Sequence, residues 1–239
     1  YPVIFRTPGL RPDVPQLLDA KEHGSVITSE MEVFFQVCPC RILAVTGSDG
    51  KTTTTSIIAG LLKAAGYNTF VGGNIGRPLL ADAGDMSPED MVVVELSSFQ
   101  LMTMDRSAEI AVVTNLAPNH LDVHTSMEEY VSAKQNIYRH QNAGGLVVLN
   151  YDNDITRSFA DDAVGEVTFF SRKKRLEQGV YVQDGPFWVS DEHGPRRVLP
   201  LLDILLPGDH NVENYMAAIE AVNGLVPDEV IRAFAASFQ

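Results

Sequence analysis

Short, almost continuously apolar runs recur along this chain and alternate with segments of helical pattern. Four of them are RILAVT (41–46), MVVVEL (91–96), AEIAVVTNL (108–116) and GLVVLN (145–150). A strand that is apolar on both sides is typical of a parallel sheet whose two faces are both covered by helices. The sequence therefore predicts an α/β fold with an open, mostly parallel sheet and helices on both faces.

The segments between these runs carry helix and turn signals. Ser29 and Glu32 form a capping box for a helix over 29–37, and a helix over 51–65 stops at Gly66. Asp-Gly and His-Gly turns between short runs predict a small β hairpin or meander within 180–199. The other expected elements are helices at 13–22, 126–140, 153–160 and 227–237, one helix after LPGDH, and strands at 25–28 and 166–170.

The composition limits the classes of function. The chain has 239 residues and a formal net charge of −13, which argues against binding to nucleic acid or to an acidic membrane. No apolar run has the length of a membrane span, and no signal peptide is visible. Cys38 and Cys40 are separated only by Pro39, so a disulfide between them would be strained. A cytoplasmic protein in a reducing compartment is expected.

A glycine-containing loop follows the first apolar strand. TGSDGKTTTT (46–55) has the order strand, loop, Lys-Thr and helix that a phosphate-binding loop requires, although Val45 stands where the usual first glycine would be. Loop amides and the helix N-terminus would face phosphate oxygens, and Lys51 would reach the outer phosphates. The hydroxyl of Thr52 would hold Mg²⁺. The alternative is an ordinary strand-to-helix turn.

Polar side chains also follow the next two strands. Glu95 ends the strand at 91–96, where ligands of open α/β sheets gather, so it is either a metal ligand or a solvent-facing residue. His120, Asp122 and His124 lie after the strand at 108–116. Their spacing allows metal contacts, but such clusters are common in polar loops, and the chemistry alone favours a polar loop.

Two further strings are candidates for ligand contacts. VGGNIGRPL (71–79) has glycines that allow the backbone to approach a ligand closely, or that merely form a tight loop. In GDHNVENYMAAIEA (208–221), Asn211 and Asn214 share a helix face. N-capping by Asp209 or Asn211 is the structural alternative.

Taken together, these strings resemble the ATP-dependent Mur ligases and the related folylpolyglutamate synthetases, in which the short loop is normal. The strings are TGSDGKTTT, GGNIG, ELSSFQL, NHLD, YVSAK and HNVEN. The resemblance covers nearly the whole chain and implies an ATP-dependent acid–amino-acid ligase. A nucleotide-binding module without ligase activity is the alternative from another class.

The resemblance also implies a role for individual residues. The nucleotide would be bound by the loop and by two asparagines near the adenine, and two Mg²⁺ ions would be held with the help of a carbamylated lysine, Lys134. Asn119 departs from the family pattern, which has Asp there. The implied nucleotide-binding residues are Gly47, Ser48, Asp49, Gly50, Lys51, Thr52, Thr53, Asn211 and Asn214. The implied metal ligands are Thr52, Glu95, His120 and Lys134, the catalytic residues Lys51, His120 and Lys134, and the substrate contacts Asn74 and Ser97.

ELSSFQL and GGNIG favour one reaction within the family. It adds D-glutamate to UDP-N-acetylmuramoyl-L-alanine through an acyl phosphate, in the synthesis of peptidoglycan precursors. Another ligase of the family, or one like a folylpolyglutamate synthetase, is the alternative. The resemblance implies that residues 1–38 are the C-terminal remnant of a UDP-binding domain with its linker and that 39–239 are the central ATP-binding domain. The C-terminal domain is expected to be absent, and the isolated chain is expected to be an inactive monomer.

Overall fold

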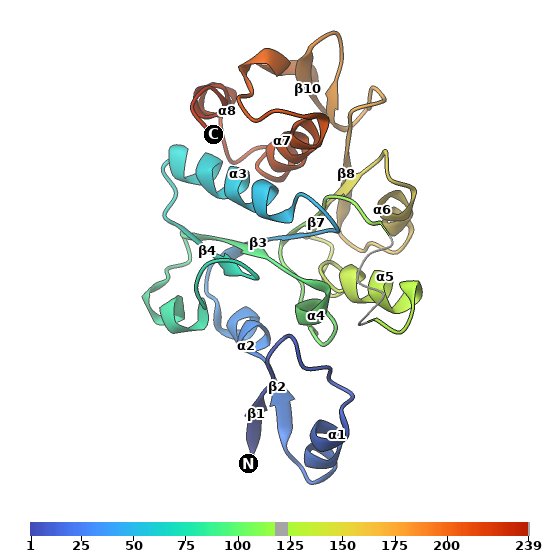
Figure 1. Ribbon diagram of the computed structural model, residues 1–239. Coiled ribbons are helices and arrows are strands. Elements are labelled where there is room, and N and C mark those ends of the chain that lie inside the picture. The colour runs from blue at the N-terminus through green and yellow to red at the C-terminus, as the bar shows by residue number, and fades with distance from the viewer. Residues whose placement is uncertain (118–123, 239) are drawn as a thin grey trace.

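A nine-stranded sheet forms the centre of the protein, as the computed structural model shows for residues 1–117 and 124–238 (Figure 1). Its strand order is β11-β10-β9-β8-β7-β6-β3-β5-β4, and every pairing from β4 to β9 is parallel. The parallel strands are β3 (Arg41–Thr46), β4 (Thr69–Gly73), β5 (Met91–Glu95), β6 (Ile110–Val113), β7 (Leu146–Asn150), β8 (Glu166–Ser171) and β9 (Gly179–Val182). This confirms the predicted fold class.

Helices cover both faces of the sheet. The helices on one face are α3 (Lys51–Ala64), α7 (Asp209–Ala221) and α8 (Asp228–Ala235), and those on the other include α2 (Glu30–Val37), α4 (Ser98–Leu101) and α5 (Met127–Gln135) (Figure 1). The shorter α6 (Asp154–Ser158) and the 3-10 turns η1 (Leu80–Asp85), η2 (Phe159–Asp161) and η3 (Leu201–Asp203) complete these layers.

Alternate residues of each parallel strand enter different cores, which explains the continuous apolar runs. In β3, Leu43 and Val45 pack in the cluster that includes Ile57 of α3 and Tyr215 of α7. Ile42 and Ala44 pack in the cluster that includes Phe34 of α2. Since successive side chains of a strand point to opposite faces, a strand covered on both faces needs apolar residues at every position.

The expected hairpin extends this sheet at one edge. β10 (Pro186–Asp191) pairs antiparallel with β9 and with β11 (Gly194–Pro200). The Asp-Gly turn connects β9 to β10, where Asp184 and Gly185 both have positive φ, and Gly194 opens β11 after the second turn. The meander predicted for 180–199 is therefore confirmed, as part of the main sheet.

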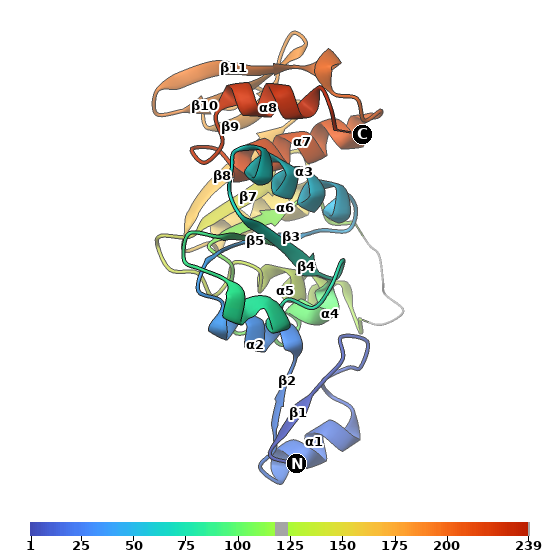
Figure 2. The ribbon, with the colours of Figure 1, turned by 90° about the vertical axis from the view of Figure 1, so that its left-hand side faces the viewer.

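The N-terminal segment projects from the central body (Figures 1 and 2). It contains the parallel strands β1 (Val3–Phe5) and β2 (Val26–Thr28), with α1 (Pro15–Glu22) between them. Arg6 ties the segment to the body, because its guanidinium donates to Thr103 Oγ1 at 3.0 Å and to Phe99 O at 3.4 Å. Helix α2 belongs to the packing of the body, since Phe34 is fully buried in the second core cluster.

Some element boundaries differ from those that the sequence predicts. The helix expected over 126–140 ends at Gln135, because the next amides, including those of Asn136 and Ile137, bond to carbonyls three residues back. The strand expected over 108–116 is limited to Ile110–Val113, and residues 69–73 form the edge strand β4, which the pattern did not predict. None of the helices in the described part of the chain is long and apolar enough to cross a membrane.

Gly60 allows α3 and α8 to pack closely. A Cβ atom at this position would collide with the ring of Phe234. We therefore expect Gly60→Leu to lower the free energy of unfolding by about 2 kcal/mol in urea denaturation, since overpacking outweighs the better helix propensity. Gly84→Leu is the matched control because no atom lies near a Cβ there. Adding Phe234→Ala to Gly60→Leu should recover part of the loss, and equal effects of the two single substitutions would contradict this packing.

Candidate functional site

Residues 47–50 form a loop between the end of β3 and the start of α3, and its shape depends on two glycines. Gly47 has φ 153° and Gly50 has φ 78°, conformations that residues with a side chain rarely adopt. A Cβ at Gly47 would collide with the hydroxyl of Thr114, and one at Gly50 with the side-chain amide of Asn214. The loop can therefore pack this closely only with glycine at both positions.

The end of the neighbouring strand β6 holds this loop in place. The hydroxyl of Thr114 donates to Asp49 O at 2.6 Å. Asn115 accepts from the backbone N–H of Asp49 on Oδ1 at 3.0 Å, and its carbonyl accepts from the N–H of Ser48 at 2.8 Å. These bonds fix the backbone of the loop through contacts within the protein itself, and such contacts reduce the ordering cost of binding.

The start of α3 has the features of an anion site. The first four N–H groups of a helix have no acceptor within the helix, and the helix dipole favours negative charge at this end. The N-cap residue Gly50 has no side chain to cap them. Lys51 adds a positive charge here, with its Nζ donating to Ser48 O at 2.9 Å. The residues therefore fit a phosphate group.

Glu95 lies at the end of β5, beside α3, and only 2% of it is exposed. Its Oε2 accepts from the hydroxyl of Thr52 at 2.6 Å, and its Oε1 accepts from Nδ2 of Asn74 at 2.9 Å. Within the described residues, neither partner carries a charge. A buried carboxylate beside a hydroxyl is the type of oxygen donor set that Mg²⁺ prefers. The pair fits a Mg²⁺ ion, although no cluster of three or more His, Cys, Asp or Glu occurs among residues 1–117 and 124–238.

Lys134 of α5 points into the same region from the opposite face of the sheet. Its side chain is buried, and Nζ donates to Thr46 Oγ1 and to Gly47 O, both at 2.9 Å. The pKa of Lys134 is lowered from 10.5 to about 7, mainly by burial and to a smaller extent by the charge of Lys51, while Glu95 opposes the shift. A substantial fraction of this amine is therefore uncharged and nucleophilic at neutral pH.

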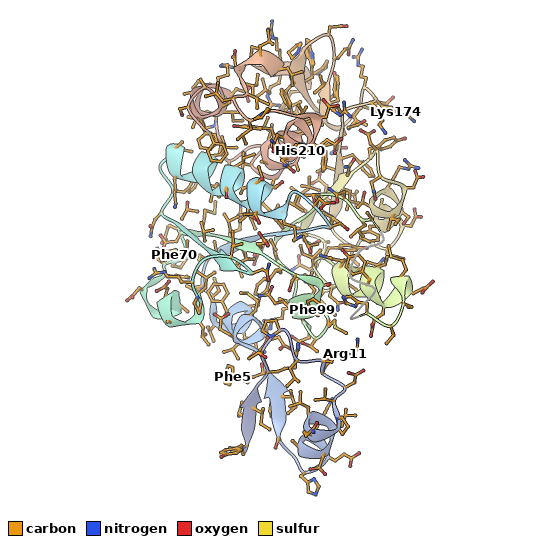
Figure 3. The ribbon with its side chains drawn as sticks, in the orientation of Figure 1. Phe5, Arg11, Phe70, Phe99, Lys174 and His210 are labelled. Carbon is orange, nitrogen blue, oxygen red and sulfur yellow. The ribbon has the colours of Figure 1, made fainter. Side chains whose placement is uncertain are left out.

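Asn211 and Asn214 contact each other at the start of α7, as their spacing predicted. Nδ2 of Asn214 donates to Asn211 Oδ1 at 3.1 Å, and Oδ1 of Asn214 accepts from Thr54 Oγ1 at 3.2 Å. Asn214 and His210 (labelled in Figure 3) also line a cavity of about 320 Å³ next to Gly50. This cavity opens beside the loop, where the rest of a nucleotide could extend from the phosphates.

The remaining site residues that the sequence predicted lie in several parts of the structure. Asn74 contacts Glu95, as described above. Ser97 caps α4, since its hydroxyl accepts from the N–H of Gln100 at 3.3 Å and the Gln100 side chain accepts from the N–H of Ser97. Thr53 lies in the first turn of α3 and is half-buried. His120, Asn119 and Asp122 lie outside the described residues.

His124 is buried. Its Nε2 shares a hydrogen bond of 2.8 Å with Ser98 Oγ, and its ring stacks on Phe99.

Several residues of the site were not predicted from the sequence. Thr46 orients Lys134, and Tyr130 bonds through its hydroxyl to Ser48 Oγ at 3.0 Å. Tyr130 stands one helical turn before Lys134, a spacing that places both on one helix face and could have identified it. Thr114 and Asn115 follow a strand end as Glu95 does, which is the corresponding signal for them.

Comparison with protein families gives a match over residues 45–222 to the Mur ligase middle domain. The UDP-N-acetylmuramoylalanine–D-glutamate ligase of Acetivibrio thermocellus is 55% identical over 238 residues, which is all of this chain and 51% of that protein. The enzyme of the same name from Ruminiclostridium cellulolyticum is 49% identical, with the same coverage. The chain thus spans about half the length of the curated relatives it matches.

Solved structures with the same fold have much lower sequence identity. The UDP-N-acetylmuramate:L-alanyl-gamma-D-glutamyl-meso-diaminopimelate ligase of Neisseria meningitides has a TM-score of 0.72 at 19% identity, covering all of this chain and 79% of that one. E. coli FolC in complex with DHPP and ADP has a TM-score of 0.62 at 22% identity, covering 86% of this chain and 59% of that one. These likenesses concern the fold alone.

The burial of Lys134 predicts a pH dependence of stability. Below pH 7 both the folded and the unfolded state bind the proton, and the full cost of burying the charge opposes folding. Between pH 7 and 10.5 only the unfolded state binds this proton, so the free energy of unfolding rises with pH.

Urea denaturation in CO₂-free buffer measures this effect. From pH 7 to 9, the free energy of unfolding of the wild type should increase by about 2 kcal/mol relative to that of Lys134→Met. Lys63→Met, which alters an exposed lysine of α3, should leave the wild-type slope unchanged. Parallel curves for the wild type and Lys134→Met would contradict the burial of this amine.

Proposed function

Because the chain belongs to the Mur ligase family, we propose that it is the ATP-binding central domain of a ligase that adds D-glutamate to UDP-N-acetylmuramoyl-L-alanine. The family match confirms the resemblance that the loop and the downstream strings indicated. One observation carries the proposal: Lys51, Thr52, Glu95 and Lys134 converge on one loop at the C-terminal edge of the sheet. Ligands of open α/β sheets bind at this edge.

The loop residues would bind the phosphates of ATP. The amides at the start of α3 and the ammonium of Lys51 would offset the charge of the phosphates, which otherwise repels an attacking carboxylate. Lys51 would exchange its bond to Ser48 O for a phosphate oxygen, and its flexible side chain allows this. Asn211 and Asn214, together with the cavity beside Gly50, would accommodate the nucleoside.

Thr52, Glu95, His120 and Lys134 would hold two Mg²⁺ ions. The ions would supply charge stabilisation for the phosphoryl group and its attacking and leaving oxygens. Lys134 would take part as a carbamate, formed when its free amine adds to the carbon of CO₂ and loses one proton. Two observations support this: burial keeps much of the amine uncharged, and the amine lies beside the loop. The carbamate would replace a buried cation by an anionic oxygen donor.

The proposed reaction has two steps. The carboxylate of the alanine residue attacks the γ-phosphorus of ATP, so that an acyl phosphate forms and ADP leaves. The amine of D-glutamate then attacks the acyl carbon, an amide bond forms, and inorganic phosphate leaves while the amine loses a proton. The chain needs no covalent nucleophile for this sequence, because its residues act by orienting the reactants and offsetting their charge.

The acyl substrate would bind between the N-terminal segment and the central body. A cavity of about 380 Å³ there is lined by Thr7, Arg6, Gly73 and Arg77, among others. The turn at Thr7 would meet the UDP phosphates, with Asn74 and Ser97 contacting the muramoyl-alanine part. In this proposal residues 1–38 belong to a UDP-binding domain and its linker, and 39–239 to the ATP-binding domain. The protein would be a cytoplasmic monomer, with the isolated chain inactive.

A substrate screen tests the proposed reaction. A protein of its relatives' full length that contains this chain should release phosphate from Mg-ATP only when UDP-N-acetylmuramoyl-L-alanine and D-glutamate are both present. L-Glutamate, diaminopimelate and a pteroate with glutamate are the comparison substrates. Turnover with another amino acid but not with D-glutamate would assign the chain to a different ligase of the family. ATP binding without any ligation would make it a nucleotide-binding module.

Calorimetry tests the site in the chain itself. We expect Lys51→Ala to weaken Mg-ATP binding at least tenfold, because one charge-assisted contact to phosphate is worth about 1.5 to 3 kcal/mol. Lys63→Ala removes an exposed lysine from the same helix and should bind like the wild type. Equal affinities of the two variants would contradict the assignment of Lys51.

A second pair of titrations tests the metal role of Glu95. Glu95→Gln keeps an acceptor for Thr52 but removes the charge. We expect this variant to bind ATP with the same affinity with and without Mg²⁺, whereas Mg²⁺ should strengthen binding to the wild type. Glu89→Gln, on the exposed turn before β5, is the control. An undiminished effect of Mg²⁺ in Glu95→Gln would remove Glu95 from the proposed ligands.

A further inference from the structure

A separate cavity lies at the N-terminal ends of the parallel strands, opposite the end of the sheet that carries the proposed ATP site. Its volume is about 480 Å³, and it is lined by Leu146 and Glu166, which begin β7 and β8, and by Glu220 near the end of α7. The turn between β10 and β11 forms another wall, and Figure 2 shows α7 between α3 and strands β9–β11. The loop and Glu95 lie at the C-terminal ends of the parallel strands, whereas this cavity lies at their N-terminal ends.

The lining of this cavity is strongly acidic. Glu166, Asp191, Glu192 and Glu220 line it, and no lysine or arginine occurs among its described lining residues. Arg196 lies next to it, but its guanidinium is already bonded to Asp191, Asp228 and Asn223. It therefore offsets mainly Asp191. Glu192 Oε1 lies 3.6 Å from His193 Nε2, whereas Glu166 and Glu220 have no ion-pair partner among the described residues. The cavity is suited to a positively charged ligand.

Glu220 is the feature that points to a bound ligand. It is 5% exposed, and Oε1 accepts from Thr168 Oγ1 at 2.6 Å. Oε2 is completely buried and has no hydrogen-bond partner among the described residues. A buried, unpartnered carboxylate oxygen is costly, and its position near the C-terminal end of α7 adds to the cost, because the helix dipole is negative there. A cation would satisfy both the oxygen and the helix end.

The cavity favours an organic cation over a bare metal ion. No three His, Cys, Asp or Glu side chains among the described residues lie close enough together to coordinate a metal. A primary ammonium group offers three N–H donors. An organic cation with a flexible carbon chain can also contact carboxylates that lie too far apart to coordinate one metal ion. Leu146 supplies an apolar contact for such a chain, and Gln178 and Asn223 supply polar ones.

We propose that this cavity binds a small organic cation with a primary ammonium group, which pairs with the carboxylate of Glu220 while Glu166 and Glu192 attract the rest of the ligand. A short diamine matches this arrangement, with one ammonium at Glu220 and the other toward the β10–β11 turn. The site is independent of the proposed ligase reaction, since it shares no residue with the ATP site.

The protonation of Glu220 adds a testable property. The pKa of Glu220 is raised to about 7, mainly by burial; the Thr168 hydrogen bond and the charge of Arg196 oppose this shift, and Asp191 and Glu166 add to it. The ammonium needs the ionised carboxylate, so affinity should be highest above pH 7 and should fall as Glu220 takes up a proton. His193 also lines the cavity.

Calorimetric titration with putrescine tests the site, at pH 8 and constant ionic strength. We expect measurable binding to the wild type, at least tenfold weaker binding to Glu220→Gln, and about tenfold weaker wild-type binding at pH 6. Glu220→Gln keeps an acceptor for Thr168 and removes the buried charge. The control is Glu229→Gln, which alters an exposed carboxylate at the neighbouring surface and should change the affinity less than twofold.

Further measurements separate a specific site from a general effect of charge. Glu166→Gln, at the exposed start of β8, should weaken putrescine binding about threefold and provides a readout if Glu220→Gln does not fold. Magnesium chloride at matched ionic strength should not displace the amine. The proposal is overturned if the wild type does not bind millimolar putrescine, if Glu229→Gln weakens binding as much as Glu220→Gln, or if Mg²⁺ competes as well as the amine does.

Discussion

The close approach of three backbone segments at residues 47–50 is the constraint on which the rest of the site depends. Gly47 packs against Thr114, and Gly50 packs against Asn214, with no room for a Cβ atom at either glycine. This approach places the end of β3, the end of β6 and the start of α7 around one short loop. The bonds from Thr114 and Asn115 hold the loop, so contacts within the protein arrange its amides. A longer phosphate loop with more glycines is therefore unnecessary here.

Buried or partly buried charged side chains lie near both ends of the parallel strands. At the C-terminal edge, the half-buried Lys51 and the buried Glu95 lie near the buried Lys134 and influence its lowered pKa. At the N-terminal edge, Glu220 is buried with an unpartnered oxygen. Helix α7 contributes to both, with Asn214 near its start and Glu220 near its end. In each place a buried charge without a full set of partners points to a ligand that would supply the missing contacts.

Much of the fold could be predicted because its determinants are local. The doubly apolar strands, the N-cap at Ser29 and the Asp-Gly turn act within a few residues, and all three features are found in the structure. Of the capping box predicted there, only the bond from the Glu32 N–H to the Ser29 hydroxyl is present among the described contacts. Strand β4 was not predicted, because its sequence TFVGG contains two glycines and becomes a strand only by pairing with β5. The end of α5 was placed too late, because its pattern continues while the hydrogen bonds change to a tighter turn.

The amino-acid sequence by itself determined most of the order of strands and helices, the glycine loop and the candidate polar side chains at the strand ends. These follow from residue type and spacing, which local physics decides. Only the tertiary structure decided that Lys134 reaches the loop from the other face of the sheet and that Thr46 and Tyr130 hold its surroundings. It also decided that Oε2 of Glu220 is buried without a hydrogen-bond partner among the described residues. Burial and pKa depend on contacts between residues far apart in the chain, such as Lys134 and Gly47, and no local pattern encodes those contacts.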